Sequence, residues 1–222
     1  LINGRITKKT FLRWNFFKNF SREIFEKFNL CLVASRETEN FLKILGAKNI
    51  KNYGNLKFSK TNLVNKTKLN PKILTKVKDK KIWCAASTHP TEEEFCGKTH
   101  LELKKHFDNI LTVIIPRHVG RVNDIYKKLS KLNLKIVLYS DFENINNDTD
   151  ILLINAYGEN LKFYELSKCV FIGKSTVNSL AKDSGQNPIE AARLGCKIFH
   201  GPHVSNFKEI YEYLKSLSIT DE

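Results

Sequence analysis

The sequence predicts an α/β protein built on a doubly wound parallel sheet. Short apolar segments of strand length alternate with segments whose apolar residues recur every three or four positions, as in helices. Candidate ligand-binding residues stand where predicted strands end, which is where open parallel sheets bind their ligands. Residues 183–195 form a loop that leads into a capped helix, and our functional interpretation centres on this segment.

The first predicted domain covers residues 1–58. Its expected elements are, in order, the end of a strand at residues 1–5, a helix at 10–28, a strand at 30–34, a helix at 37–45 and a strand at 49–53. Ser35 is placed to cap the second helix, and Gly46 to end it. The strand–helix–strand order implies that the strands are parallel.

Residues 59–80 are rich in Lys, Asn and Thr, and we interpret them as a connection between domains with one short helix near residues 73–77. The second predicted domain covers residues 81–222. Its expected strands lie at residues 82–86, 110–115, 135–139, 151–154, 169–172 and 197–199. Helices are expected to alternate with these strands. One of them ends near residue 106, and the others span residues 122–132, 161–167, 187–195 and 207–217. This alternation is typical of a doubly wound domain.

The 222-residue chain has a formal net charge of +14, and the whole excess lies in its first 80 residues. There, 19 Lys and Arg stand against 5 Asp and Glu, whereas residues 81–222 hold 18 basic and 18 acidic residues. A basic segment beside a neutral one favours contact with a polyanionic surface, such as phospholipid, lipid A-type phosphates or nucleic acid. A compositional bias toward Lys and Asn is the alternative explanation.

The predicted helix at residues 10–28 is rich in aromatic side chains. Its expected buried face, from the spacing, consists of Phe17, Phe20, Ile24 and Phe28. Its interleaved aromatic and basic residues include Arg13, Trp14, Phe16, Phe17 and Lys18. This composition fits a helix at a membrane interface, base stacking and phosphate contacts in a nucleic-acid-binding protein, or an ordinary core helix.

Three global features limit the class of protein. No segment reaches the roughly 18 apolar residues of a membrane-spanning helix, and no signal peptide is visible. Met is absent even at the first position, so we expect an internal piece of a longer protein. Five cysteines are scattered without a CxxC pair, which fits reduced cytoplasmic thiols better than a disulfide framework or a zinc site.

The segment at residues 183–195 carries the signals of a helix start. The Asn187 side chain is expected to cap the helix, with Pro188 at the first helical position and Glu190 completing a capping box. Gly195 is placed to end it. A glycine-containing loop before a helix N-terminus suits an anion, because backbone N–H groups and the helix dipole both face the ligand. The alternative is a well-formed helix start and nothing more.

Two further candidates stand at strand ends. Ser87, Thr88 and His89 follow the first strand of the second domain, and their hydroxyl and backbone N–H groups are candidates for holding phosphate. The nearby Glu93 and Glu94 are expected to be surface charges that complement the helix dipole. Arg117 and His118 follow the next strand. Arg117 is a candidate clamp for phosphate or carboxylate, His118 assists or only orients the loop, and a structural role is the alternative for both.

A third strand end carries Gly158 and Glu159, where a backbone amide and a carboxylate could meet a base or a ribose. Glu190 also suits the hydroxyls of a ribose. The loop at residues 201–207 either lines the same cleft or turns the chain. The sequence contains no Ser-His-Asp order, no metal-ligand cluster, no GxxxxGK[ST] and no strand-linked GxGxxG. With these motifs absent, the function class that the strand-end residues still favour is binding of a nucleotide or a nucleotide sugar.

The motifs also occur in an order that resembles one family. Residues 1–7 (LINGRIT) are similar to an LVNARLS-type element, 54–58 (GNLKF) to GNLKFD, 86–94 (ASTHPTEEE) to STHxGEEE, 116–121 (PRHVGR) to PRHxxR, 187–192 (NPIEAA) to HNxLEPA, and 201–207 (GPHVSNF) to GPHxxNF. Together they resemble the 3-deoxy-D-manno-octulosonic acid (Kdo) transferases, which add Kdo to lipid A precursors. The resemblance spans almost the whole chain.

The resemblance implies an inverting, metal-independent enzyme of the glycosyltransferase B type, without a cofactor. Its donor would be CMP-Kdo, its acceptor a lipid A precursor, and its place the anionic membrane surface at the cytoplasmic face of the bacterial inner membrane, with no nucleic-acid partner. The implied CMP contacts are Pro116, Arg117, Tyr157, Gly158, Glu159, Asn187, Pro188, Ile189 and Glu190. The implied donor loop comprises Ser87, Thr88, His89 and His118, and the implied membrane or acceptor contacts are Arg13, Trp14, Phe16, Phe17 and Lys18.

The resemblance also implies limits. The family's catalytic glutamate belongs to an N-terminal glycine-rich element that this sequence lacks, so we expect an inactive fragment whose residues 1–58 end an acceptor domain. Gln186 stands where the family has His, which puts a role for that histidine in doubt. Two rivals stay open: a transferase of the same fold that uses a UDP-sugar, and a basic nucleic-acid module that uses Trp14 and neighbouring phenylalanines.

Overall fold

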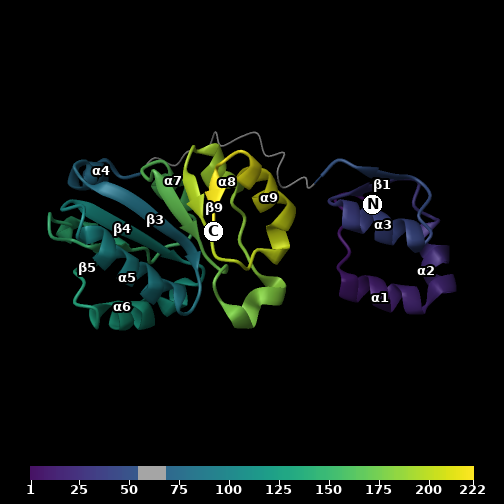
Figure 1. The fold of residues 1–222 in the computed structure, drawn as a ribbon, viewed down its shortest axis with the longest axis horizontal. Helices are drawn as coiled ribbons and strands as arrows, with labels where there is room; N and C mark the ends of the chain where they lie inside the picture. The colour runs from purple at the N-terminus through teal and green to yellow at the C-terminus, as the bar shows by residue number, and fades with distance from the viewer. Residues whose placement is uncertain (55–68) are drawn as a thin grey trace. The chain divides into compact units, whose positions relative to one another are not determined.

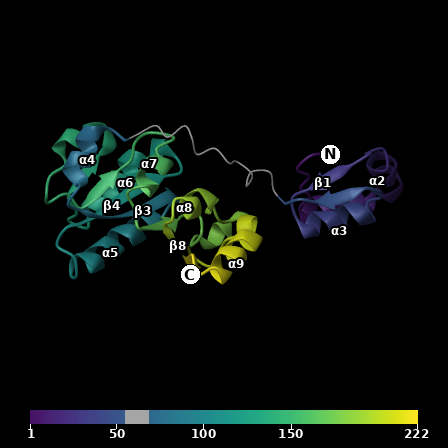
Figure 2. The same cartoon turned by 90° about the horizontal axis from the view of Figure 1, so that it is seen from above.

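A computed structural model describes residues 1–54 and 69–222, in two compact units, Leu1–Asn65 and Lys66–Glu222. Figures 1 and 2 show the elements of each unit. The GNLKFD-like segment after Gly54 and the first ten residues of the expected connection, 59–68, lie outside the described residues.

The described part of the first unit, residues 1–54, pairs two short parallel strands with three helices. Its elements are α1 (Lys8–Phe16), α2 (Lys18–Phe25), β1 (Cys31–Val33), α3 (Arg36–Ile44) and β2 (Ile50–Asn52). Gly4 adds a parallel bridge to Val33, as expected for the end of a strand. The Ser35 side chain caps α3 by accepting a hydrogen bond from the Thr38 amide at 3.2 Å, which confirms the predicted cap.

The prediction of a single helix at residues 10–28 is wrong. The chain breaks at Phe17, whose φ of −99° and ψ of 58° are not helical, and forms α1 and α2 on either side. The break changes the phase of the apolar face, so Phe17 and Phe20 are 63% and 58% exposed rather than buried. Phe25 fills the small core instead, together with Cys31, Val33, Leu42 and Leu45.

The second unit is a seven-stranded parallel sheet in the order β5-β6-β4-β3-β7-β8-β9. The strands are β3 (Lys81–Thr88), β4 (Ile110–Pro116), β5 (Ile136–Leu138), β6 (Ile151–Leu153), β7 (Cys169–Ile172), β8 (Lys197–Phe199) and β9 (Thr220–Asp221). The helices are α4 (Pro71–Val77), α5 (Glu92–Lys104), α6 (Val122–Ser130), α7 (Asn160–Tyr164), α8 (Ile189–Arg193) and α9 (Lys208–Ser216). Short 3-10 helices follow β4, β5, β7 and β8.

Helices cover both faces of this sheet, as a doubly wound fold requires. Side chains of α5 and α6 pack into one core, and those of α4, α7, α8 and α9 into the other (Figures 1 and 2). The strand order reverses at β3, which has β4 on one side and β7 on the other. Ligand sites in such sheets lie beyond the strand ends at the reversal, so β3, β4 and β7 are the strands that position a site.

The short helix expected near residues 73–77 is present as α4, and it packs on the second unit. Its Ile73 and Val77 are 1% and 3% exposed and belong to the core of the second unit. The ammonium group of Lys80 donates hydrogen bonds to the carbonyl oxygens of Asn147 and Thr149 at 2.8 and 3.1 Å. Residues 69–80 are therefore part of the second unit. Ile73 and Val77 are four residues apart, the spacing of one helix face, but they stand in a lysine-rich sequence.

Candidate functional site

Four strand-end loops form a row, because β6, β4, β3 and β7 are consecutive neighbours in the sheet. They carry residues 155–159, 117–118, 87–91 and 173–176 respectively. Backbone hydrogen bonds fix the loops to one another. The Arg117 amide donates to the Thr88 oxygen at 3.0 Å, and the Gly173 amide donates to the Ala86 oxygen at 2.8 Å. The predicted donor loop and Arg117 are thus brought together.

Arg117 combines a fixed backbone with an exposed side chain. Pro116, the last residue of β4, is buried and anchors the loop behind it. Within residues 1–54 and 69–222, no carboxylate forms an ion pair with the Arg117 guanidinium. A cation that is held in place without an internal partner is suited to an anionic ligand, and its planar fork can contact phosphate through two N–H groups.

The two histidines beside Arg117 contact each other. The ring centroids of His89 and His118 are 6.0 Å apart and the rings are nearly perpendicular. Burial lowers the pKa of His89 below its ordinary value, so the ring is neutral at pH 7, and its Nδ1 lies 3.1 Å from the carbonyl oxygen of Ser87. His118 is exposed. The two rings thus meet beside Arg117, and the buried ring of His89 adds no charge there.

The Ser87–His89 loop does not present all the groups that the phosphate hypothesis needs. Thr88 is fully buried, and the His89 amide donates to the Glu92 carboxylate at 2.9 Å. Ser87 has a φ of 56°, a left-handed conformation that non-glycine residues rarely adopt. The Thr88 hydroxyl is thus buried and the His89 amide already has an acceptor, and phosphate contacts from Ser87, Thr88 and His89 stay a prediction.

The acidic residues that follow behave differently from one another. Glu93 is buried and forms a two-bond ion pair with Arg121, with N–O distances of 2.8 and 3.0 Å, so the prediction of a surface charge is wrong. Its partner lies 28 residues away, beyond the reach of local sequence patterns. Glu94 is a half-exposed partner of Lys128 at 3.4 Å, as expected of a surface charge.

The loop after β6 presents an aromatic ring and hides its carboxylate. Tyr157 is 74% exposed, and Gly158 has a φ of 81° with open space on its Cβ side. Glu159 accepts a hydrogen bond from the Tyr139 hydroxyl at 2.9 Å and pairs with Lys162 at 2.8 Å. Burial, with help from Glu159, raises the pKa of Tyr139 to about 12. A base or ribose contact by Tyr157, Gly158 or Glu159 stays a prediction.

Helix α8 confirms part of the predicted cap. The Asn187 side chain accepts a hydrogen bond from the Ile189 amide at 3.0 Å, and Gly195 follows the helix with a φ of 78°. The helix begins at Ile189, however, so Pro188 precedes it. With five residues, α8 is too short for the helix-dipole argument to carry weight. Glu190 is exposed and available, and its ribose role stays a prediction.

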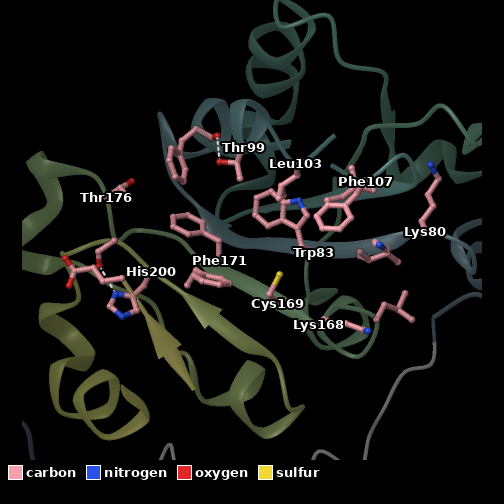
Figure 3. A pocket seen from close by; sticks show the side chains of 18 of the residues that line it. Lys80, Trp83, Thr99, Leu103, Phe107, Lys168, Cys169, Phe171, Thr176 and His200 are labelled. Atoms are coloured by element: carbon pink, nitrogen blue, oxygen red, sulfur yellow. Dashed lines mark hydrogen bonds between the residues drawn. The ribbon is translucent and has the colours of Figure 1, made fainter. Parts of the chain in front are cut away.

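A separate cavity of about 1090 Å³ lies on the face of the sheet. Figure 3 shows the side chains that line it. Its apolar lining includes Trp83, Phe95, Leu103, Phe107 and Phe171, and Thr176 and His200 lie at one end. None of the predicted nucleotide contacts lines it. The sequence showed the bulky apolar residues of these strands and of α5, but their assembly around one cavity depends on the order of strands and helices in space.

In the first unit, the predicted membrane residues fall on the helix break. Phe16 and Phe17 are 82% and 63% exposed, and Arg13 and Lys18 are exposed beside them. Trp14 turns inward and packs edge-to-face on Phe25, with ring centroids 5.3 Å apart. In the part of the chain that the structure describes, no helix is long and apolar enough to cross a membrane.

Comparison with known proteins identifies the family. Residues 1–60 match a family model described as 3-deoxy-D-manno-octulosonic-acid transferase (kdotransferase). The 3-deoxy-D-manno-octulosonic acid transferase of Rickettsia prowazekii is 32% identical over 213 residues, which are 95% of this chain and 44% of that protein. The chain belongs to the Kdo transferase family. The Haemophilus influenzae transferase is 35% identical over 136 residues, which are 61% of this chain and 31% of that protein.

The chain spans less than half the length of these Kdo transferases. A solved structure, the C-terminal CMP-Kdo binding domain of WaaA from Acinetobacter baumannii, is similar to 65% of this chain. It is 23% identical, the match covers 75% of that domain, and the TM-score is 0.60. This likeness, together with the parallel sheet, confirms the predicted doubly wound fold of the glycosyltransferase B type.

Proposed function

We propose that this chain is the part of a Kdo transferase that binds the CMP-Kdo donor, in the pathway that builds lipopolysaccharide. The observation that carries the proposal is Arg117, an exposed cation that forms no ion pair with any described residue, at the strand order reversal of a domain with the fold of a CMP-Kdo binding domain. The acceptor is a lipid A precursor. We place no catalytic base among the described residues, so we expect donor binding, and no sugar transfer, from this chain alone.

Each predicted contact has a role in this proposal. Arg117 neutralises the phosphate of CMP and stabilises the charge that develops on CMP as it departs. Glu190, exposed on α8, accepts hydrogen bonds from the ribose hydroxyls, while Tyr157 and the Gly158 amide meet the base. These roles need no metal ion, because the guanidinium supplies the positive charge that the leaving phosphate requires.

Replacing Arg117 with alanine is expected to weaken CMP binding. A charge-assisted hydrogen bond contributes about 1.5–3 kcal/mol, which corresponds to roughly a 10- to 100-fold rise in the dissociation constant. Glu190→Ala is expected to act in the same direction by about tenfold. Calorimetric titration of CMP measures both, with Lys131→Ala, an exposed lysine at the end of α6, as the control. Unchanged affinity in both variants would remove the basis of the proposal.

We also propose that the first unit contacts an anionic membrane surface. Its described residues, 1–54, hold 11 Lys and Arg against 4 Asp and Glu. Phe16 and Phe17 project at the helix break, with Arg13 and Lys18 beside them. Exposed aromatic rings flanked by basic side chains fit an anionic lipid interface, because the rings enter the acyl boundary while the charges meet the phosphates.

The double substitution Phe16→Ser and Phe17→Ser is expected to weaken binding to vesicles that contain anionic lipid. Burying one Phe contributes about 1.5–3 kcal/mol, so we expect a loss of at least roughly tenfold in vesicle sedimentation. Zwitterionic vesicles serve as the reference surface. If the wild-type chain instead binds RNA in a salt-dependent way and ignores both kinds of vesicle, the nucleic-acid rival is correct.

A further inference from the structure

The carboxylate of Glu92, the first residue of α5, is fully buried and accepts five hydrogen bonds. Its Oε2 accepts from the amides of His89 at 2.9 Å and Lys174 at 2.8 Å. Its Oε1 accepts from the amides of Ser175 at 2.9 Å and Thr176 at 3.1 Å, and from the Thr176 hydroxyl at 3.0 Å. One side chain therefore joins the loops that follow β3 and β7.

The donors around Glu92 are neutral. Across the described residues, no Lys, Arg or His side chain forms an ion pair with this carboxylate. A buried charge without a counter-ion is costly unless hydrogen bonds replace its lost hydration, and the five donors do this. The consecutive amides of Lys174, Ser175 and Thr176 form the kind of concave nest that binds anions, and Glu92 fills it. A ligand phosphate must therefore bind elsewhere along the strand ends.

The same contacts reach Arg117. Glu92 holds the His89 amide, and the preceding residue, Thr88, accepts the Arg117 amide through its carbonyl oxygen at 3.0 Å. A chain of hydrogen bonds thus runs from the loop after β7 through Glu92 to the loop after β3, and from there to Arg117. Lys174 adopts a φ of 57°, a left-handed conformation that non-glycine residues rarely take and that the surrounding bonds must hold.

We propose that Glu92 is a positioning residue for the nucleotide site: it fixes the loop after β3 and thereby the place of Arg117. The inference rests on the proposed function, since it takes CMP as the ligand. Glu92 itself is fully buried and does not touch the ligand. Its neighbour Glu93 is a natural control, because it is also buried in the first turn of α5 but pairs with Arg121 on the side of α6.

The substitution Glu92→Gln tests this directly. Each Glu92 oxygen accepts at least two hydrogen bonds, so the amide NH₂ of Gln would face N–H donors in either orientation. We expect the CMP dissociation constant to rise at least roughly tenfold in Glu92→Gln and to change less than about twofold in Glu93→Gln. Both are measured by calorimetry at a temperature where circular dichroism shows that each variant is folded.

Thr176→Val provides a milder variant if Glu92→Gln does not fold. It removes one of the five hydrogen bonds, and we expect CMP binding to weaken about threefold. Backbone amide NMR signals of residues 117 and 175 should shift in either variant, which a purely stabilising carboxylate would not cause at residue 117. Unchanged CMP affinity in the variants, with normal binding by the wild type, overturns the role of Glu92 alone. Failure of the wild-type chain to bind CMP overturns both the positioning role and the proposed function.

Discussion

Replacing Asp150 with alanine is expected to lower the free energy of unfolding of the second unit by about 3 kcal/mol. Asp150 precedes β6 and is 4% exposed. Its Oδ1 accepts from His100 Nε2 at 3.2 Å and from Lys104 Nζ at 2.6 Å, and its Oδ2 accepts from the Lys135 amide at 2.8 Å. The variant leaves the His100 and Lys135 donors without acceptors, at about 1–3 kcal/mol each. Urea unfolding measures the loss.

Lys104→Ala is the matched control, because it removes the ammonium group that pairs with Asp150 while leaving the buried donors paired. The Lys104 side chain is 48% exposed, so water screens its interaction with Asp150, and we expect a change below about 1 kcal/mol. If Lys104→Ala destabilises the unit more than Asp150→Ala does, the cluster depends on the ion pair and our account of it is wrong.

The same cluster sets a dependence on pH. Burial lowers the pKa of His100 below its ordinary value of 6.5, and the neutral ring donates through Nε2 to Asp150 while Nδ1 accepts from Thr112 at 2.8 Å. Burial alone would raise the pKa of Asp150, but hydrogen bonds from Lys104, Lys135 and His100 outweigh it and hold that pKa below 3.8. In both cases the unfolded chain binds protons more readily than the folded one.

Stability should therefore fall as the pH drops below about 6.5, first through His100 and then, below about 3.8, through Asp150. The sign follows from the lowered pKa values: these groups stabilise the fold fully only above their unfolded pKa. His100→Gln should flatten the slope between pH 7 and pH 5 in thermal unfolding. A wild-type chain that becomes more stable over that range would contradict the assignment.

Replacing Gly173 with alanine is expected to destabilise the second unit by about 3 kcal/mol and to weaken CMP binding at least roughly tenfold. A Cβ at this position would lie 2.6 Å from the Ser87 carbonyl oxygen and 2.7 Å from both the Thr88 Cα and the Glu92 Oε2. Backbone atoms of a central strand cannot move aside as a flexible side chain can, so the extra methyl group forces the loop after β3 outward. Unfolding in urea and CMP titration measure the two effects.

Gly120→Ala is the control for Gly173→Ala. Gly120 lies in the 3-10 helix Val119–Arg121, and a Cβ there would meet no atom within 4 Å. We expect its stability to change by less than about 0.5 kcal/mol. If Gly173→Ala is equally harmless, the close approach of β7 to the loop after β3 is looser than this structure describes.

The fold was predictable wherever local patterns determine it. The strands of the second unit are short apolar segments, and each predicted one lies within a residue or two of its place in the sheet. Patterns failed where contacts across the fold decide. The short helix near residues 73–77 was predicted, but not that its Ile73 and Val77 pack into the core of the second unit. No proline or glycine in residues 10–28 marks the break at Phe17.

The site was predictable in the same partial way. The position of Arg117 after a strand identified a candidate cation, because parallel strands place their ends along one edge. The hydrogen-bond partners of the acidic residues could not be predicted from the sequence. Glu92 binds amides 82–84 residues away, and Glu159 binds the Tyr139 hydroxyl, 20 residues away. Such pairings depend on strand order, which local spacing does not encode.

Competition between CMP and UDP for the wild-type chain tests the central claim most directly. The two nucleotides separate a Kdo transferase from a transferase of the same fold that uses a UDP-sugar, because their bases differ in hydrogen-bonding groups and UDP carries one more phosphate. We expect calorimetry to show saturable CMP binding and to require at least roughly tenfold more UDP to displace it. Tighter binding of UDP, or no binding of CMP at all, would contradict the assignment of this domain to a CMP-Kdo donor.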